Sequence, residues 1–196
     1  MTRYFLDTEF IDTGSTIDLI SIGVVSEDGR EYYKQNLKYF GRVCCHDDMR
    51  DVPQWIIDNV FSSLSCDTSV WSDRTVMKAE ILHFIDNEQY GKPELWGWCS
   101  GYDWVALCQL FGTMMGVPDG WPHYIKDIQF LLDDYGLSDD ALPQQEEGLH
   151  NALSDAKHIK KIWEFLSRYE AEQIAQKMLT RYDSLQPAPI FLHRTV

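Results

Sequence analysis

The segment 5–10, Phe-Leu-Asp-Thr-Glu-Phe, constrains the fold most, because it places two carboxylates inside an otherwise apolar strand. Strand side chains alternate between faces, so Asp7 and Glu9 point to the same side. Two residues of strand span about 6.6 Å, which lets both carboxylates contact one hard cation. Unpaired buried like charges are unfavourable, and a divalent metal offsets their repulsion. The alternative is an edge strand with two solvated acids, and this motif alone does not decide between them.

The next part of the chain predicts an antiparallel meander. Residues 3–8, 17–25 and 31–37 show strand patterns, and the run 17–25 is apolar almost throughout, as in a central strand covered on both faces. The Asp28-Gly29 pair between the second and third runs is typical of a tight hairpin. We therefore expect three strands joined by short turns.

Helices and strands alternate after the meander. The predicted elements are a helix over 75–87, a strand over 94–98, a helix over 103–111, a strand over 123–126, a helix over 127–135 and a helix from 151 through 166 that continues to about 182. This order predicts an α/β fold with a five-stranded mixed sheet, antiparallel at first and then parallel, flanked by helices. An extended tail is expected at 186–189.

The segment 38–74 shows no clear periodicity beyond a short helix expected over 52–61. The run 44–48, Cys-Cys-His-Asp-Asp, has metal-binding residue types, but adjacent residues converge poorly on one tetrahedral ion and no second ligand pair follows at zinc-finger spacing. A surface loop is the expectation there. The chain has 5 cysteines, an odd number without C-x-x-C spacing, which favours reduced thiols and a cytoplasmic location.

The formal net charge of −14 argues against a broad, sequence-independent grip on duplex phosphates. It is compatible with a small nucleic-acid site, because bound metal ions supply positive charge locally and acids hold them. The length of 196 residues suits one domain with a substantial core. No apolar run is long enough to span a bilayer, and the first residues lack the pattern of a signal peptide.

Three further residues bear on chemistry: Asp103, His150 and Asp155. Asp103 and Asp155 each fall in the first turn of an expected helix, where an acid is also a common stabilising feature. Five residues correspond to about 500° on a regular helix, so His150 and Asp155 do not share a helix face. If His150 precedes the helix, with Asn151 as the capping residue, its ring is free to turn toward Asp155. The other histidines are expected at the surface.

Together these residues resemble the DEDDh family of 3′–5′ exonucleases, which have the RNase H-like fold. The matching motifs are segments 5–10, 100–107 and 150–156, in family order, and the likeness covers about residues 3–168. The resemblance implies an exonuclease domain over 1–168, followed by a helical extension and tail over 169–196 packed on the same domain. Segments 7–11, 19–25, 27–33 and 102–110 further resemble the polyadenylate-specific 3′-exoribonuclease group, RNase AS.

The resemblance also implies the site. Two divalent ions, Mg²⁺ or Mn²⁺, would be held by Asp7, Glu9, Asp103 and Asp155, with Asp7 bridging both and Asp103 at the second ion. His150 would be the general base that takes a proton from the attacking water. All-oxygen ligands suit these hard cations. The expected reaction removes nucleoside 5′-monophosphates from the 3′ end of single-stranded RNA, with a preference for adenylate.

Single strands are commonly held by stacking on aromatic rings, and Phe10, Tyr102 and Trp104 are the expected substrate-binding residues. Aromatic side chains also fill cores, so packing is the competing interpretation of all three. Two other functions stay open: the same chemistry on single-stranded DNA or short oligonucleotides, and a non-catalytic nucleic-acid-binding module. Related exonucleases are often homodimers. An apolar stripe could pack in the core or against a second copy: Ile159, Ile162, Trp163, Leu166, Ile174 and Met178.

Overall fold

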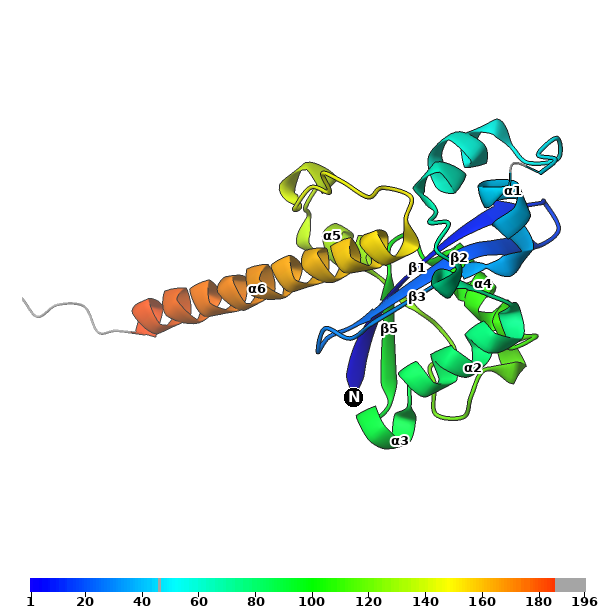
Figure 1. Cartoon of the computed structure of the whole chain (residues 1–196). Coiled ribbons are helices and arrows are strands. Elements are labelled where there is room, and N and C mark those ends of the chain that lie inside the picture. Colours follow the sequence, from blue (N-terminus) through cyan, green and yellow to red (C-terminus); the bar gives the residue numbers. More distant parts are fainter. Residues whose placement is uncertain (46, 186–196) are drawn as a thin grey trace, which may run out of the picture.

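Six strands form one sheet in the order β4-β3-β2-β1-β5-β6. The computed structural model describes residues 1–45 and 47–185, so His46 and the tail expected at 186–189 lie outside the described residues (Figure 1). The strands are β1 Thr2–Asp12, β2 Ile17–Ser26, β3 Glu31–Asn36, β4 Trp71–Ser72, β5 Pro93–Gly97 and β6 Lys126–Asp127. The α-helices are α1 Phe40–Cys44, α2 Arg74–Phe84, α3 Asn87–Tyr90, α4 Gly101–Leu110, α5 Ile128–Tyr135 and α6 Ala152–Leu185.

The expected α/β class and the mixed sheet are confirmed. Strands β1, β2 and β3 pair antiparallel in sequence order, and β5 and β6 continue the sheet in parallel from β1. The expected number of five strands is wrong, because β4 adds a sixth by pairing parallel with β3. The strand expected over 123–126 is the two-residue β6, displaced toward the C-terminus. Strands of two residues leave too little alternation in a sequence to be recognised.

The sheet separates two apolar layers, because successive side chains of β1 point to opposite faces. Tyr4 and Leu6 pack with α2 and α4, in a cluster that includes Met77 and Leu107. Phe5 packs with α5 and α6 on the other face. Asp7 and Glu9 share the face of Phe5, and Thr8 shares the face of Leu6. Figure 1 shows α6 on one side of the sheet and α2 and α4 on the other. The two acids therefore face α6.

The start of α6 lies unusually close to the sheet. Gly23 on β2 is the register partner of Asp7 on β1. A Cβ atom at Gly23 would lie 2.2 Å from the carbonyl oxygen of Ala152 and 2.5 Å from the backbone nitrogen of Leu153. The missing side chain thus leaves the space in which the first turn of α6 rests on β2, beside the acids of β1.

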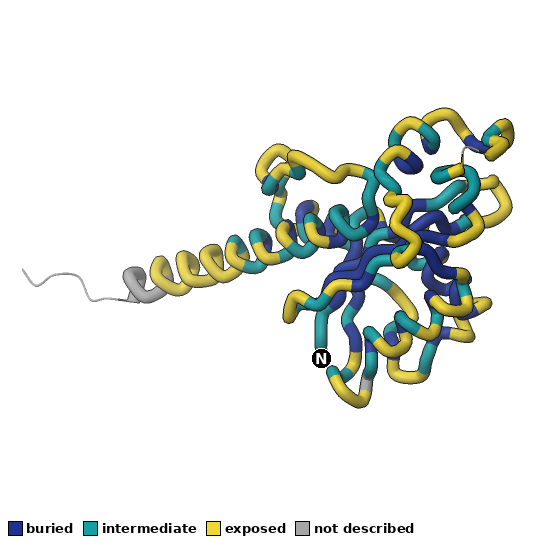
Figure 2. Tube along the Cα trace, in the orientation of Figure 1, coloured by how far each residue is buried: buried dark blue, intermediate teal, exposed yellow. Residues whose placement is uncertain are grey.

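Helix α6 leaves the body of the molecule after its first half (Figures 1 and 2). Ile159, Ile162 and Leu166 are buried in the core. Tyr169 still contacts Tyr135 of α5, with 5.7 Å between ring centroids. Residues 171–180 are all exposed. The expectation that the extension packs on the same domain is therefore wrong for these residues, because no element of the described chain lies over them.

The segment 38–74 forms a third apolar cluster against β2. The expected helix over 52–61 is a single turn, Ile56–Val60, followed by a 3₁₀ turn, Phe61–Ser63. Both turns bury apolar side chains around Ile20. Among the described residues, no helix is long and apolar enough to cross a membrane.

Cys44 and Cys66 form a disulfide, with 5.6 Å between their Cα atoms. The expectation that all cysteines are reduced thiols is wrong for this pair, and the argument for a cytoplasmic location loses that support. The partners lie 22 residues apart in the sequence, and only the fold of the irregular segment brings them together. Cys45, Cys99 and Cys108 are free thiols. The described residues around 47–48 are exposed, as expected for a surface loop.

Candidate active site

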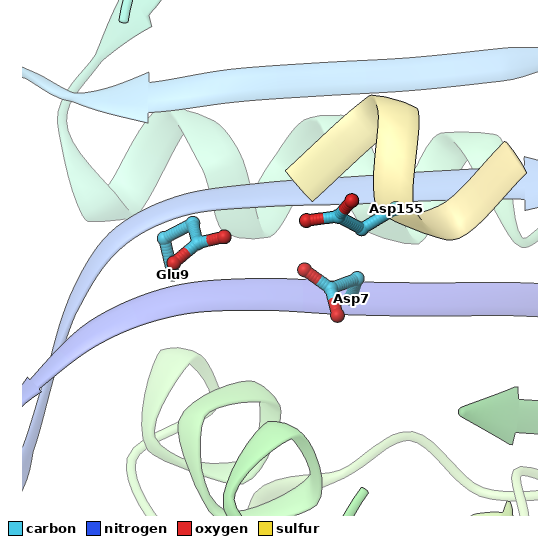
Figure 3. A group of neighbouring side chains, drawn as sticks. All are labelled: Asp7, Glu9 and Asp155. Atoms are coloured by element: carbon cyan, nitrogen blue, oxygen red, sulfur yellow. The ribbon is translucent and has the colours of Figure 1, made fainter. Parts of the chain in front are cut away.

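Three carboxylates converge between β1 and α6. Asp7, Glu9 and Asp155 each offer an oxygen, and these atoms all lie within 4.8 Å of one another. Figure 3 shows Asp155, from the first turn of α6, above the two acids of the strand. The alternation of β1 places Asp7 and Glu9 on one face, and the close contact of α6 with Gly23 brings Asp155 next to them. The structure brings these three predicted residues together, and their role as metal ligands stays a prediction.

Asp103 lies on the other side of β1. It is 5% exposed, in the first turn of α4. The backbone N–H of Thr8 donates to Oδ1 of Asp103 at 2.9 Å, and the Thr8 hydroxyl donates to the same oxygen at 2.5 Å. The structure therefore places Asp103 next to the cluster, but not among the three carboxylates that converge.

The four acids are held at unfavourable electrostatic positions. Burial, followed by the charges of Asp103, Asp155 and Glu9, raises the pKa of Asp7 well above its ordinary value. Burial, followed by the charges of Asp155 and Asp103, raises the pKa of Glu9 to about 8. Burial raises the pKa of Asp103 to about 6, against the two hydrogen bonds from Thr8. The pKa of Asp155 is raised by burial. Like charges in this arrangement favour either protonation or bound cations.

His150 precedes α6, which is the arrangement that leaves its ring free to turn toward Asp155. Its φ of 61° lies in the left-handed region, which is uncommon for a residue with a side chain. The Ser63 hydroxyl donates to the His150 carbonyl oxygen. Asn151 caps the helix, because its Oδ1 accepts from the backbone N–H of Ser154 at 3.2 Å. The predicted cap is confirmed.

The irregular segment also contacts the His150 ring. Trp55 meets the imidazole edge to face, with 4.9 Å between centroids and 78° between planes. Neither Trp55 nor Ser63 was expected at the site, because the segment around them shows no periodicity. Gln145 was also not expected, and its Nε2 donates to Oδ1 of Asp155 at 2.6 Å.

The expected aromatic residues lie beyond Glu9. The rings of Phe10 and Tyr102 lie 5.5 Å apart between centroids, and Tyr102 is 52% exposed. Phe10 and Trp104 are partly buried against the core under α4. Phe10 and Tyr102 thus form an aromatic wall next to the cluster, whereas Trp104 serves packing at least in part.

A cavity of about 560 Å³ opens between α6 and the loop that precedes it. Asp7, His150 and Asp155 are among its lining residues. The carboxylate cluster is therefore reachable by a molecule that enters this cavity.

Comparison with known proteins bears on the identity of this arrangement. The model of a family described as the 3′-5′ exoribonuclease Rv2179c-like domain matches residues 2–167. The chain belongs to this family. Two relatives from Mycobacterium tuberculosis are named 3'-5' exoribonuclease Rv2179c (strain ATCC 25618 / H37Rv) and 3'-5' exoribonuclease MT2234.1 (strain CDC 1551 / Oshkosh). Each is 37% identical over 156 residues, which cover 79% of this chain and 87% of the relative.

The expected kinship with 3′–5′ exoribonucleases is confirmed. The Rv2179c-like match includes every residue of the candidate site, from Asp7 to Asp155. It ends at residue 167, so the projecting part of α6 lies beyond the Rv2179c-like domain.

Proposed function

We propose that this protein is a DEDDh-type 3′–5′ exoribonuclease that releases nucleoside 5′-monophosphates from single-stranded RNA. The observation that carries the proposal is the convergence of Asp7, Glu9 and Asp155 within 4.8 Å, in a chain of a 3′–5′ exoribonuclease family. A group of acids with raised pKa values beside a histidine is a common arrangement in active sites.

The donor set fits divalent cations. Asp7, Glu9 and Asp155 offer only oxygen atoms, which hard ions such as Mg²⁺ and Mn²⁺ prefer. Among the neighbouring charges, that of Asp103 acts most strongly on Asp7, so Asp7 is the residue suited to bridge a second ion. When bound, two such ions stabilise the incoming and leaving oxygens of an in-line displacement at phosphorus.

His150 supplies the base in this proposal. An imidazole nitrogen accepts a proton from the attacking water, and the ring needs a fixed orientation to do so. The hydrogen bond from Ser63 to the His150 backbone and the contact with Trp55 fix that orientation. Gln145 holds one oxygen of Asp155 and so orients the carboxylate.

The aromatic wall formed by Phe10 and Tyr102 receives the 3′-terminal base in this proposal, because every base has a face that can stack. Trp104 supports the wall from the core side. A preference for adenylate rests on the resemblance to RNase AS alone. A homodimer is proposed on the same ground.

The test is degradation of end-labelled RNA and DNA homopolymers with Mg²⁺ or Mn²⁺, with and without chelator. We expect RNA to yield 5′-mononucleotides only when the ion is present. Degradation of DNA at the same rate would favour the alternative substrate, since contacts to the 2′-hydroxyl distinguish the two. Metal-dependent RNA binding without any product would instead indicate a binding module. Poly(A) degraded no faster than poly(U) would remove the adenylate preference.

A further inference from the structure

The cavity beside α6, here called the α6 cavity, has no role in the function proposed above. Its apolar lining comes from the strand end, the loop and the helix, at Trp98, Leu142, Ile159 and Ile162. Its volume of about 560 Å³ lies within the range of roughly 300–1,000 Å³ that is common for ligand sites. A space of this size and lining is suited to a flat organic group.

The α6 cavity and the aromatic wall adjoin different residues of the carboxylate cluster. Asp7 and Asp155 line the cavity, whereas Glu9, Phe10 and Tyr102 do not. Along β1, Glu9 leads toward Phe10, and Asp7 lies at the other end of the cluster (Figure 3). A phosphate held by the cluster would therefore have one attached nucleotide on each side.

The chemistry of the lining favours a base over a phosphate. No lysine or arginine is among the lining residues within the described chain, and Asp139 adds a negative charge. His158 supplies a polar group next to the apolar surface. Nucleobases combine flat faces that stack with edges that accept and donate hydrogen bonds.

We propose that the α6 cavity binds the base of the nucleotide on the 5′ side of the scissile phosphate, while the aromatic wall receives the 3′-terminal base. This inference rests on the proposed exonuclease function. In the reaction, water forms a bond to phosphorus, the bond to the 3′-oxygen of the upstream nucleotide breaks, and that oxygen leaves with a proton. The upstream nucleotide is thus the leaving group, and the cavity holds it during cleavage.

Two substrates isolate this subsite. The first is the dinucleotide adenylyl-(3′–5′)-adenosine, and the second is the 4-nitrophenyl ester of adenosine 5′-monophosphate, in which nitrophenol replaces the whole upstream nucleotide. Both release adenosine 5′-monophosphate, so the cluster and the aromatic wall act on both alike. Only the dinucleotide has a base to place in the α6 cavity.

Gln144 provides a matched pair of variants, because it is exposed, lines the cavity and donates to the carbonyl oxygens of Asp139 and Leu142. Gln144→Trp and Gln144→Ala both remove these hydrogen bonds, but only the tryptophan fills the cavity. We expect Gln144→Trp to lower kcat/KM for the dinucleotide, relative to that for the nitrophenyl ester, by about tenfold to a hundredfold, as for the loss of one stacked base. Gln144→Ala should keep the wild-type ratio within a few-fold.

A parallel loss on both substrates, or an unchanged ratio in Gln144→Trp, would overturn the subsite. A substrate with an abasic upstream residue gives a measurement that needs no variant. Wild-type protein should cleave it about tenfold or more slowly than the dinucleotide, and equal rates would also overturn the subsite. If the wild-type protein cleaves long RNA but shows no such difference, the proposed function stands without the subsite. If it cleaves no substrate, both proposals fail.

Discussion

At the scale of single residues, Asp7 lies where the charges of three other acids act most strongly. Replacing it with asparagine keeps the shape of the side chain and removes the charge. We expect Asp7→Asn to lose the metal's contribution to transition-state stabilisation, several kcal/mol, which lowers kcat at least about a thousandfold. The same change should raise the Tm of the metal-free protein, because a neutral amide relieves repulsion.

The measurements are single-turnover cleavage of labelled RNA and thermal unfolding in chelator. Ser15→Ala is a matched control at an exposed turn away from the cluster. An Asp7→Asn variant with wild-type cleavage would contradict the proposed role of this residue.

The raised pKa values also predict how stability depends on pH. Folding raises the pKa of Glu9 from 4.5 to about 8 and that of Asp103 from 3.8 to about 6. The folded metal-free protein therefore binds these protons more tightly than the unfolded chain, and its stability decreases as pH rises through this range. We expect Tm in chelator to fall between about pH 5 and about pH 8, and Mg²⁺ or Mn²⁺ to raise Tm more at the higher pH.

Glu9→Gln is the control for this effect. It removes one of the titrating groups, so its Tm should depend less on pH than that of the wild type. A metal-free protein whose Tm rises steadily over the same range would contradict the electrostatic account of the cluster.

The residues of the cluster could be predicted because their chemistry shows in the sequence. Asp7 and Glu9 stand out as charges in an apolar strand. His150 and Asp155 are five residues apart, which lets the histidine ring turn toward Asp155 when the helix begins between them. The sequence already places Asp103 at the start of a helix, but only the structure shows that its carboxylate accepts hydrogen bonds from Thr8 on β1. Gln145 gave no signal, because glutamine in a polar loop is ordinary.

At the scale of elements, the turn around Ile56–Val60 and the residues up to Ser63 form a support for His150. The edge-to-face contact between Trp55 and His150 is worth roughly 0.5–1.5 kcal/mol. We expect Trp55→Ala to lower kcat by a few-fold to about tenfold. Trp55→Phe keeps an aromatic ring and should recover most of the loss, since it still constrains the imidazole.

The pH profile of kcat separates positioning from folding. A misplaced base changes the pH dependence of the rate as well as its maximum, whereas partial unfolding lowers the rate equally at each pH. A Trp55→Ala variant with the wild-type rate and profile would show that the contact has no positioning role.

The elements of the meander and the parallel strand β5 were predictable because each carries a run long enough to show its period. The segment 38–74 was not predictable, since its helical turns have only three to five residues and its strand β4 has two. Its order comes from contacts distant in sequence: the Cys44–Cys66 disulfide and the bonds between Gln35 and Ser65. Such contacts have no local signature.

At the scale of the whole molecule, α6 divides the predicted apolar stripe into two parts. Ile159, Ile162 and Leu166 are in the core, whereas Ile174 is 51% and Met178 is 68% exposed. A single helical segment without tertiary contacts is marginally stable in water, so this half of α6 favours a partner. If the protein is a homodimer, we therefore expect its interface in the part of the chain beyond Glu170.

Truncation after Glu170 tests this division. We expect the shortened chain to keep the wild-type kcat on a dinucleotide and a Tm within a few degrees, because residues 171–180 are all exposed. If the full-length protein is a dimer by light scattering, the shortened chain should be a monomer. A shortened chain that remains dimeric would place the interface on the exonuclease domain instead.

Gly23 has a consequence for how mutations in this family would be interpreted. It touches no substrate and lies on the strand behind Asp7, yet an added methyl group would collide with the backbone of Ala152. The collision would shift the turn that carries His150 and Asp155 while leaving both side chains chemically intact. In a survey of variants, substitutions of Gly23 would therefore lower activity as much as substitutions of the catalytic residues. The cause would be the short distance between β2 and α6, not a role in the chemistry.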